Sequence, residues 1–106
     1  MTNKQKLFGA LAIAGLSVSP EAYALDALVV GAAQYASYNV DVRDRIHCVG
    51  AFSTVDVLDA SVTTPSLSDL SAYDAVFVYS EVAFNDPAGL GDTLADYVDG
   101  GGGVVV

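Results

Sequence analysis

The chain of 106 residues has no tryptophan, one cysteine and one histidine. A lone cysteine, Cys48, excludes an internal disulfide framework. Cys48 and the single histidine, His47, together supply too few ligands for an ordinary zinc site within one copy of the chain. The two residues are adjacent on one expected helix, so their side chains point about 100° apart and do not form a nucleophile–base pair. We expect Cys48 to be buried as a small apolar residue, with a reactive thiol as the alternative.

Positive charge is also scarce, with four cationic residues against thirteen acidic ones and a formal net charge of −9. Lys4 and Lys6 lie near the N-terminus, so residues 25–106 keep only Arg43 and Arg45. Such an acidic surface repels phosphate backbones and argues against nucleic-acid binding. It suits an extracellular location, high-salt surroundings or divalent cations, and composition leaves these three alternatives open.

The chain has no apolar run long enough to span a bilayer. Residues 7–18 form its longest apolar segment, about 12 residues where a span needs about 20. Lys4 and Lys6 precede this segment, and Ala22-Tyr23-Ala24 follows it as a small-x-small cleavage site. We therefore predict that residues 1–24 are a secretory signal peptide, cleaved after Ala24. The mature protein is then secreted or periplasmic and keeps no membrane span.

Residues 25–106 carry the pattern of an α/β domain. Continuous apolar runs at 27–30 and 75–79 predict strands that are covered on both faces. The segment 52–60 alternates, which is typical of a half-exposed edge strand. Residues 104–106 are a fourth strand that follows a turn of glycines.

Helices are predicted between these strands. Asn39 is placed as the N-cap of a helix that carries Val42, Ile46 and Val49 on its apolar face and ends at Gly50. Residues 66–71 are long enough for one helical turn only. A last helix over 88–99 follows Asp86 as its cap and Pro87 at its first position, with Leu90, Leu94 and Val98 along one face.

Alternating strands and helices predict a parallel sheet with right-handed crossovers. Because the second strand has the alternating pattern of an edge strand, we expect a flavodoxin-like α/β sheet of order 2-1-3-4. A complete doubly wound domain commonly has more strands. Residues 25–106 are therefore interpreted as a partial domain, incomplete at the C-terminus.

In this order a crevice opens between the first and third strands at their carboxyl ends. The loops there supply the candidate ligand-binding residues, which are Gln34, Tyr35, Tyr38, Ser80, Glu81, Asn85 and Asp86. Ordinary loop chemistry, with Asp86 and Asn39 serving only as caps, is the alternative. Gly100 to Gly103 precede a strand rather than a helix, so they are read as a helix exit and not as a phosphate cradle.

No catalytic residue and no organic cofactor are predicted. Glu81 has no evident partner for general-base chemistry, and no dinucleotide or P-loop motif follows the first strand. Asp92, Asp96 and Asp99 share one face of the last helix, and with Glu81, Asn85 and Asp86 nearby they could hold Ca²⁺, which takes six to eight oxygen ligands. Because no spaced calcium-loop motif is present, we favour a solvated acidic face.

Two stretches carry a resemblance, LSAYDAVFV at 70–78 and LADYVDGGGGVVV at 94–106. They resemble the N-terminal half of the class I glutamine-amidotransferase-like superfamily, closest to its ThuA-like and secreted bacterial relatives. This resemblance implies a flavodoxin-like fold. In catalytic members the nucleophile elbow, or the histidine of ThuA-like proteins, follows the strand that corresponds to residues 104–106. No position of this chain matches that residue.

These observations together predict a non-catalytic binding or accessory module of a secreted protein, with an unidentified ligand or protein partner. The alternative is the N-terminal fragment of a secreted hydrolase or amidotransferase-like enzyme whose catalytic residues lie beyond Val106. A third expectation is self-association, because the last strand leaves a sheet edge that can recruit a second copy.

Overall fold

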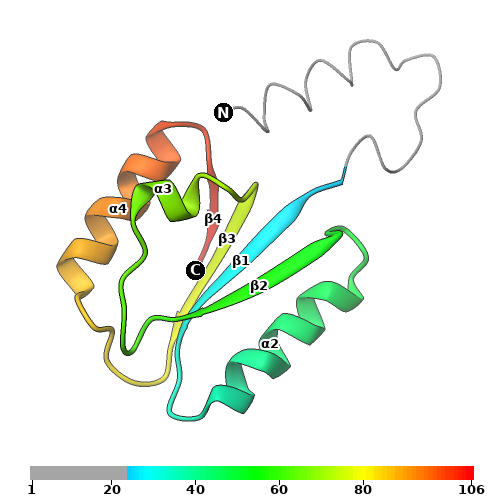
Figure 1. Cartoon of the computed structure of the whole chain (residues 1–106), viewed down its shortest axis with the longest axis horizontal. Helices are drawn as coiled ribbons and strands as arrows, with labels where there is room; N and C mark the ends of the chain where they lie inside the picture. The colour runs from blue at the N-terminus through cyan, green and yellow to red at the C-terminus, as the bar shows by residue number, and fades with distance from the viewer. Residues whose placement is uncertain (1–23) are drawn as a thin grey trace.

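The computed structural model describes residues 24–106. The predicted signal peptide therefore lies, apart from Ala24, outside the described residues. Seven elements follow one another in the order β1 (Asp26–Ala32), α2 (Ala36–Cys48), β2 (Thr54–Asp59), α3 (Leu67–Leu70), β3 (Ala75–Ser80), α4 (Pro87–Asp99) and β4 (Gly103–Val105). The four strands are parallel in the order β2-β1-β3-β4, which confirms the predicted flavodoxin-like α/β arrangement (Figure 1).

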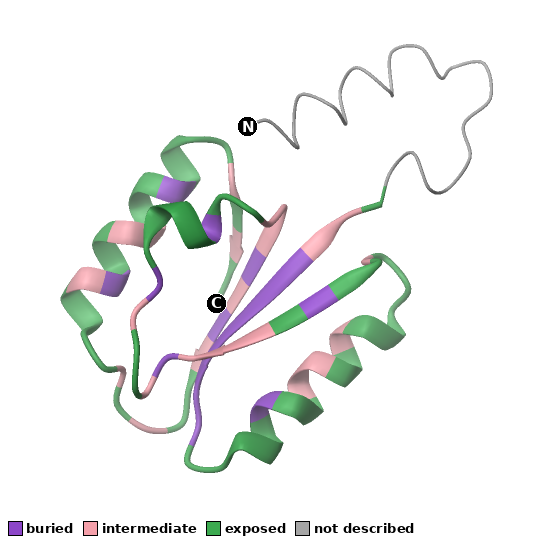
Figure 2. Ribbon diagram, viewed as in Figure 1, coloured by how far each residue is buried: buried purple, intermediate pink, exposed green. Residues whose placement is uncertain are grey.

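β1 is one of the two inner strands of the sheet, and its residues are apolar on both faces. From Ala27 onward every residue of β1 is buried, as the purple ribbon of Figure 2 shows. Val29 lies in register with Val57 of β2 on one side and with Phe77 of β3 on the other. β2 alternates between buried and exposed positions at its start and lies at the edge, as its sequence predicted.

Helices cover both faces of the sheet, in accordance with the alternation of side chains along each strand. On one face Leu28, Val30 and Val76 pack with residues of α3 and α4. On the other face Ala27, Val29 and Val55 pack against α2. The rings of Phe52 and Phe77, which meet edge to face, add to that layer. In Figure 1, α2 accordingly lies on one side of the sheet and α3 with α4 on the other.

α4 begins as its sequence predicts, with Pro87 in the first turn and the Asp86 carboxylate accepting from Gly89 N at 3.1 Å. Its apolar face differs from the prediction at one position, because Tyr97 is 5% exposed whereas Val98 is 49% exposed. At about 100° per residue, seven residues after Leu90 return to within about 20° of its direction, and eight residues do not. The buried stripe of α4 therefore ends on the tyrosine.

Tyr97 joins the two stretches that carry the family resemblance. Its hydroxyl donates to Tyr73 O at 2.8 Å, and its ring occupies the space where a side chain at residue 102 would lie. Glycine is therefore required at position 102, because the ring of Tyr97 lies against the backbone there. Its neighbour Gly101 has a φ of 104°, which lies in the left-handed region that favours glycine. The glycines form the turn from α4 into β4, as predicted.

Three predictions about α2 were wrong. The helix begins at Ala36 after Tyr35, so Asn39 is not its cap but a helical residue that is 2% exposed. Val49 lies just past the helix and is 76% exposed. Cys48 is exposed as well, because it lies about 200° around the helix from the sheet-facing Ile46.

The helices of residues 24–106 are short. The longest two, α2 and α4, have 13 residues each. Within this part of the chain no helix is long and apolar enough to cross a bilayer.

Candidate functional site

Two loops meet where β1 and β3 end, and hydrogen bonds tie them together. Glu81 N and Val82 N donate to Ala32 O at 2.8 and 3.1 Å, which extends the pairing of the two strands. In return Gln34 N donates to Glu81 Oε1 at 2.9 Å. The carboxylate of Glu81 therefore bridges the two loops at the point where the order of the sheet reverses.

An aromatic pair lies beside this bridge. The rings of Tyr35 and Tyr38 meet edge to face, with centroids 5.3 Å apart and an interplanar angle of 85°. Both remain accessible, at 54% and 43% exposed. Tyr38 belongs to the first turn of α2 rather than to a loop, so the helix holds one ring of the pair.

A buried polar network fixes that first turn of α2 to the sheet. Asn39 Nδ2 donates to Gly31 O at 3.1 Å, and Asn39 Oδ1 accepts from the hydroxyl of Tyr79. Gly31 has no room for a Cβ, because Asn39 and Tyr79 already fill the space. The pKa of Tyr79 is raised, first by burial and then by the negative charges of Glu81, Asp41 and Asp59. Three carboxylates therefore surround this end of the sheet.

The structure divides the candidate residues into two groups. Gln34, Tyr35, Tyr38 and Glu81 lie together at the ends of β1 and β3, with Ser80 exposed as the last residue of β3. The other two candidates have structural bonds. Asn85 N donates to Ala60 O at 2.8 Å, its Nδ2 donates to Thr64 Oγ1 at 3.3 Å, and Asp86 caps α4.

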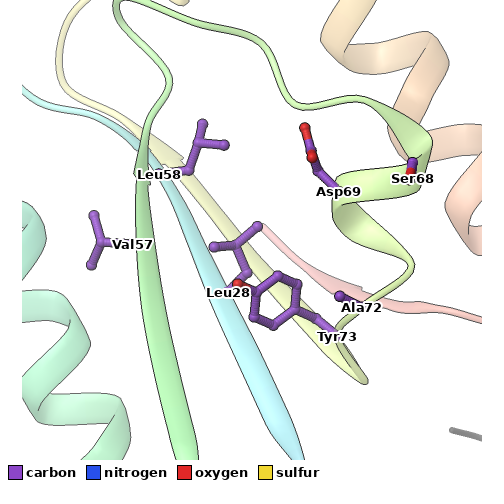
Figure 3. Close-up of a pocket in the computed structure, with 7 residues that line it drawn as sticks. All are labelled: Leu28, Val57, Leu58, Ser68, Asp69, Ala72 and Tyr73. Carbon is purple, nitrogen blue, oxygen red and sulfur yellow. The ribbon is translucent and has the colours of Figure 1, made fainter.

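A second feature, a groove between β2 and α3, was not predicted from the sequence. It has a volume of about 380 Å³ and is lined by Leu28, Val57, Leu58, Ser68, Asp69, Ala72 and Tyr73 (Figure 3). The shortness of α3 could have indicated it, because a helix of four residues covers only part of the sheet face over β2.

Polar groups border this groove. Tyr73 donates its hydroxyl to Asp56 Oδ2 at 2.7 Å, and burial, followed by this bond to Asp56, raises the pKa of Tyr73 to about 12. Asp69 completes a capping box, since its Oδ2 accepts from Ser66 N at 2.9 Å while its own N–H donates to Ser66 Oγ at 3.0 Å. The polar groups at the groove are therefore the neutral phenol of Tyr73 and negatively charged carboxylates.

Residues 24–106 contain no group of three or more histidine, cysteine, aspartate or glutamate side chains placed to hold a metal ion. The acidic residues of α4 are all exposed, as a solvated face would be. Calcium binding stays a prediction from the sequence.

The fold, with its parallel sheet of order 2-1-3-4, defines a flavodoxin-like α/β protein. No family model, no curated protein and no solved structure matches the chain. The amidotransferase-like resemblance therefore rests on the two sequence stretches that carry it.

Proposed function

We propose that this protein is a non-catalytic binding module of a secreted protein, built on an amidotransferase-like α/β fold. It takes its ligand in the crevice over the carboxyl ends of β1 and β3. The observation that carries this proposal is the accessible Tyr35–Tyr38 pair held beside the Glu81 carboxylate. In open α/β sheets this is the position at which ligands bind.

The chemistry of the pair suits recognition more than reaction. Each tyrosine offers an apolar ring and a hydroxyl, so together they can contact a ligand face while they bond to its polar edge. Glu81 adds a negative charge, and its anchoring by Gln34 N keeps that charge in place. A small ligand with an apolar body and a polar or cationic group matches this arrangement.

A thermal-shift screen of amines, amino acids, sugars and nucleosides tests the proposal. A ligand at about 100 times its Kd stabilises the folded state by about 2.7 kcal/mol, which is a readily measured rise in Tm. We expect such a ligand to stabilise the wild-type chain but not the double variant Tyr35→Ser/Tyr38→Ser.

Val40→Ala is the matched control, because Val40 is exposed on α2 like Tyr38 and takes no part in the contact between the Tyr35 and Tyr38 rings. It should keep the ligand-induced rise in Tm. A ligand that shifts the tyrosine variant as much as the wild type would place binding elsewhere and contradict this site. A screen without any stabilising compound would count against the binding function itself. The sequence that follows Val106 tests the enzyme alternative, which requires a nucleophile elbow or a histidine after that strand.

A further inference from the structure

We propose that the groove between β2 and α3 docks an extended, lysine- or arginine-bearing segment of a partner protein, which adds to the sheet as a strand along the outer edge of β2. This surface lies apart from the crevice over β1 and β3. Main-chain pairing would supply the affinity and alternate side chains the specificity, as in other cases of strand addition.

The edge of β2 has the main-chain groups that such a strand needs. Within residues 24–106, β2 pairs only with β1. Ala60 N donates to Gly31 O at 3.0 Å, so the main chain of residue 60 faces β1. Because this direction alternates along a strand, the N–H and C=O groups of Val55 and Val57 face away from β1. These groups are available to an incoming strand.

The groove adjoins this same edge. Val57 lines it although its side chain points toward α2 in Figure 3, so the main chain of Val57 borders the groove. Leu58 and Leu28 point into the opposite layer and form an apolar floor. Every second side chain of an added strand would point over that floor, between β2 and α3.

Charge decides the chemistry of the partner. Asp69 is an exposed carboxylate that lines the groove, and Asp56 is an exposed carboxylate on β2 that is bonded to the lining Tyr73. The two arginines of residues 24–106, Arg43 and Arg45, lie on α2, which covers the other face of the sheet. Each forms an ion pair with an aspartate of its own helix. Cationic side chains of an extended segment therefore complement the rim of the groove, and the acidic surface disfavours a nucleic acid.

Three synthetic peptides of eight residues, each titrated by fluorescence anisotropy into the purified chain, test this proposal. The first alternates lysine and valine, the second replaces lysine by glutamate, and the third is the lysine peptide with alternate main-chain nitrogens methylated. We expect binding of the first peptide only. Loss on methylation would identify main-chain pairing, since methylation leaves every charge in place.

Paired charge variants locate the site. Asp56→Asn/Asp69→Asn removes two charges while both side chains still accept hydrogen bonds from Tyr73 and Ser66. We expect it to weaken binding of the lysine peptide by about three- to tenfold. The control Asp92→Asn/Asp96→Asn on α4 removes the same charge from an exposed helix face and should change binding less than about twofold.

Val57→Pro tests the edge directly, because proline is tolerated on an edge strand where the N–H faces outward. We expect it to abolish peptide binding and to preserve the circular dichroism spectrum. Three results would overturn the proposal: equal binding of the lysine and glutamate peptides, binding that survives methylation, or equal effects of the two charge variants. A dimer that Val57→Pro dissociates would also overturn it, since a second copy would then occupy the edge.

Discussion

The hydrogen bond from Tyr79 to the buried Asn39 makes a sharp prediction about stability. Tyr79→Phe removes the only donor that the described residues offer to Asn39 Oδ1. Asn39 is 2% exposed, so its oxygen would be left buried without a partner. An orphaned buried acceptor costs about 1–3 kcal/mol. For a domain of this size about 4–8 °C of Tm accompanies each kcal/mol, so a loss of about 2 kcal/mol lowers Tm by about 8–16 °C.

Urea unfolding followed by far-ultraviolet circular dichroism measures this loss. Tyr73→Phe is the matched control, because it also removes one phenolic donor, but its acceptor Asp56 is exposed and becomes hydrated again. We expect the control to cost less than about 1 kcal/mol. In a double-mutant cycle with Asn39→Ala, Tyr79→Phe should show a coupling energy of at least about 1 kcal/mol. Equal losses for the two phenylalanine variants, or no coupling, would refute the reasoning.

Five further predictions follow from the structure and the sequence. Gly102→Ala should destabilise the fold by about 1–3 kcal/mol, because the ring of Tyr97 fills the position of the added Cβ. Its control Gly91→Ala, in open space on α4, should stabilise the fold by up to about 1 kcal/mol. Equal effects of the two variants in chemical denaturation would contradict this reasoning. Burial raises the pKa of Tyr73 and of Tyr97 from 10.0 to about 12, with Asp56 as the next cause for Tyr73 and Asp74 for Tyr97. The tyrosines of the unfolded chain therefore ionise first, and the free energy of unfolding should fall as pH rises from 10 to 12. Mass spectrometry of the exported protein should show an N-terminus at residue 25; an intact leader would contradict the signal peptide. A rise of Tm on addition of calcium would support the cation site on α4. A molar mass from light scattering that stays that of a monomer at every concentration would contradict self-association through β4.

The sequence predicts the sheet of this protein well because its pattern reports burial directly. A strand covered on both faces is apolar throughout, as in β1, and an edge strand alternates, as in β2. Caps are also local, so Asp86 and Pro87 place the start of α4 correctly. These features need no knowledge of distant contacts.

The error at Asn39 arises where a distant contact overrides the local pattern, whereas those at Cys48 and Val98 come from the angular position of each residue around its helix. Asn39 is a favourable cap by propensity, yet its amide bonds to Gly31 and Tyr79 hold it inside α2. The candidate site is predicted only in part for the same reason. The meeting of Tyr35 with Tyr38 depends on where α2 begins, and the groove beside β2 depends on how little of the sheet α3 covers.

The position of β1 between β2 and β3 has a consequence for the order in which we expect the protein to fold. β1 is the first described element in the chain, but Asp26 N donates to a carboxylate 48 residues later, at Asp74. During synthesis β1 can therefore pair with β2 well before β3 is available. We expect the closure of the longer loop between β1 and β3 to be the slower step, because distant pairings form slowly. Until β3 pairs, one edge of β1 stays open, and we expect the chain to be most prone to aggregate during this interval.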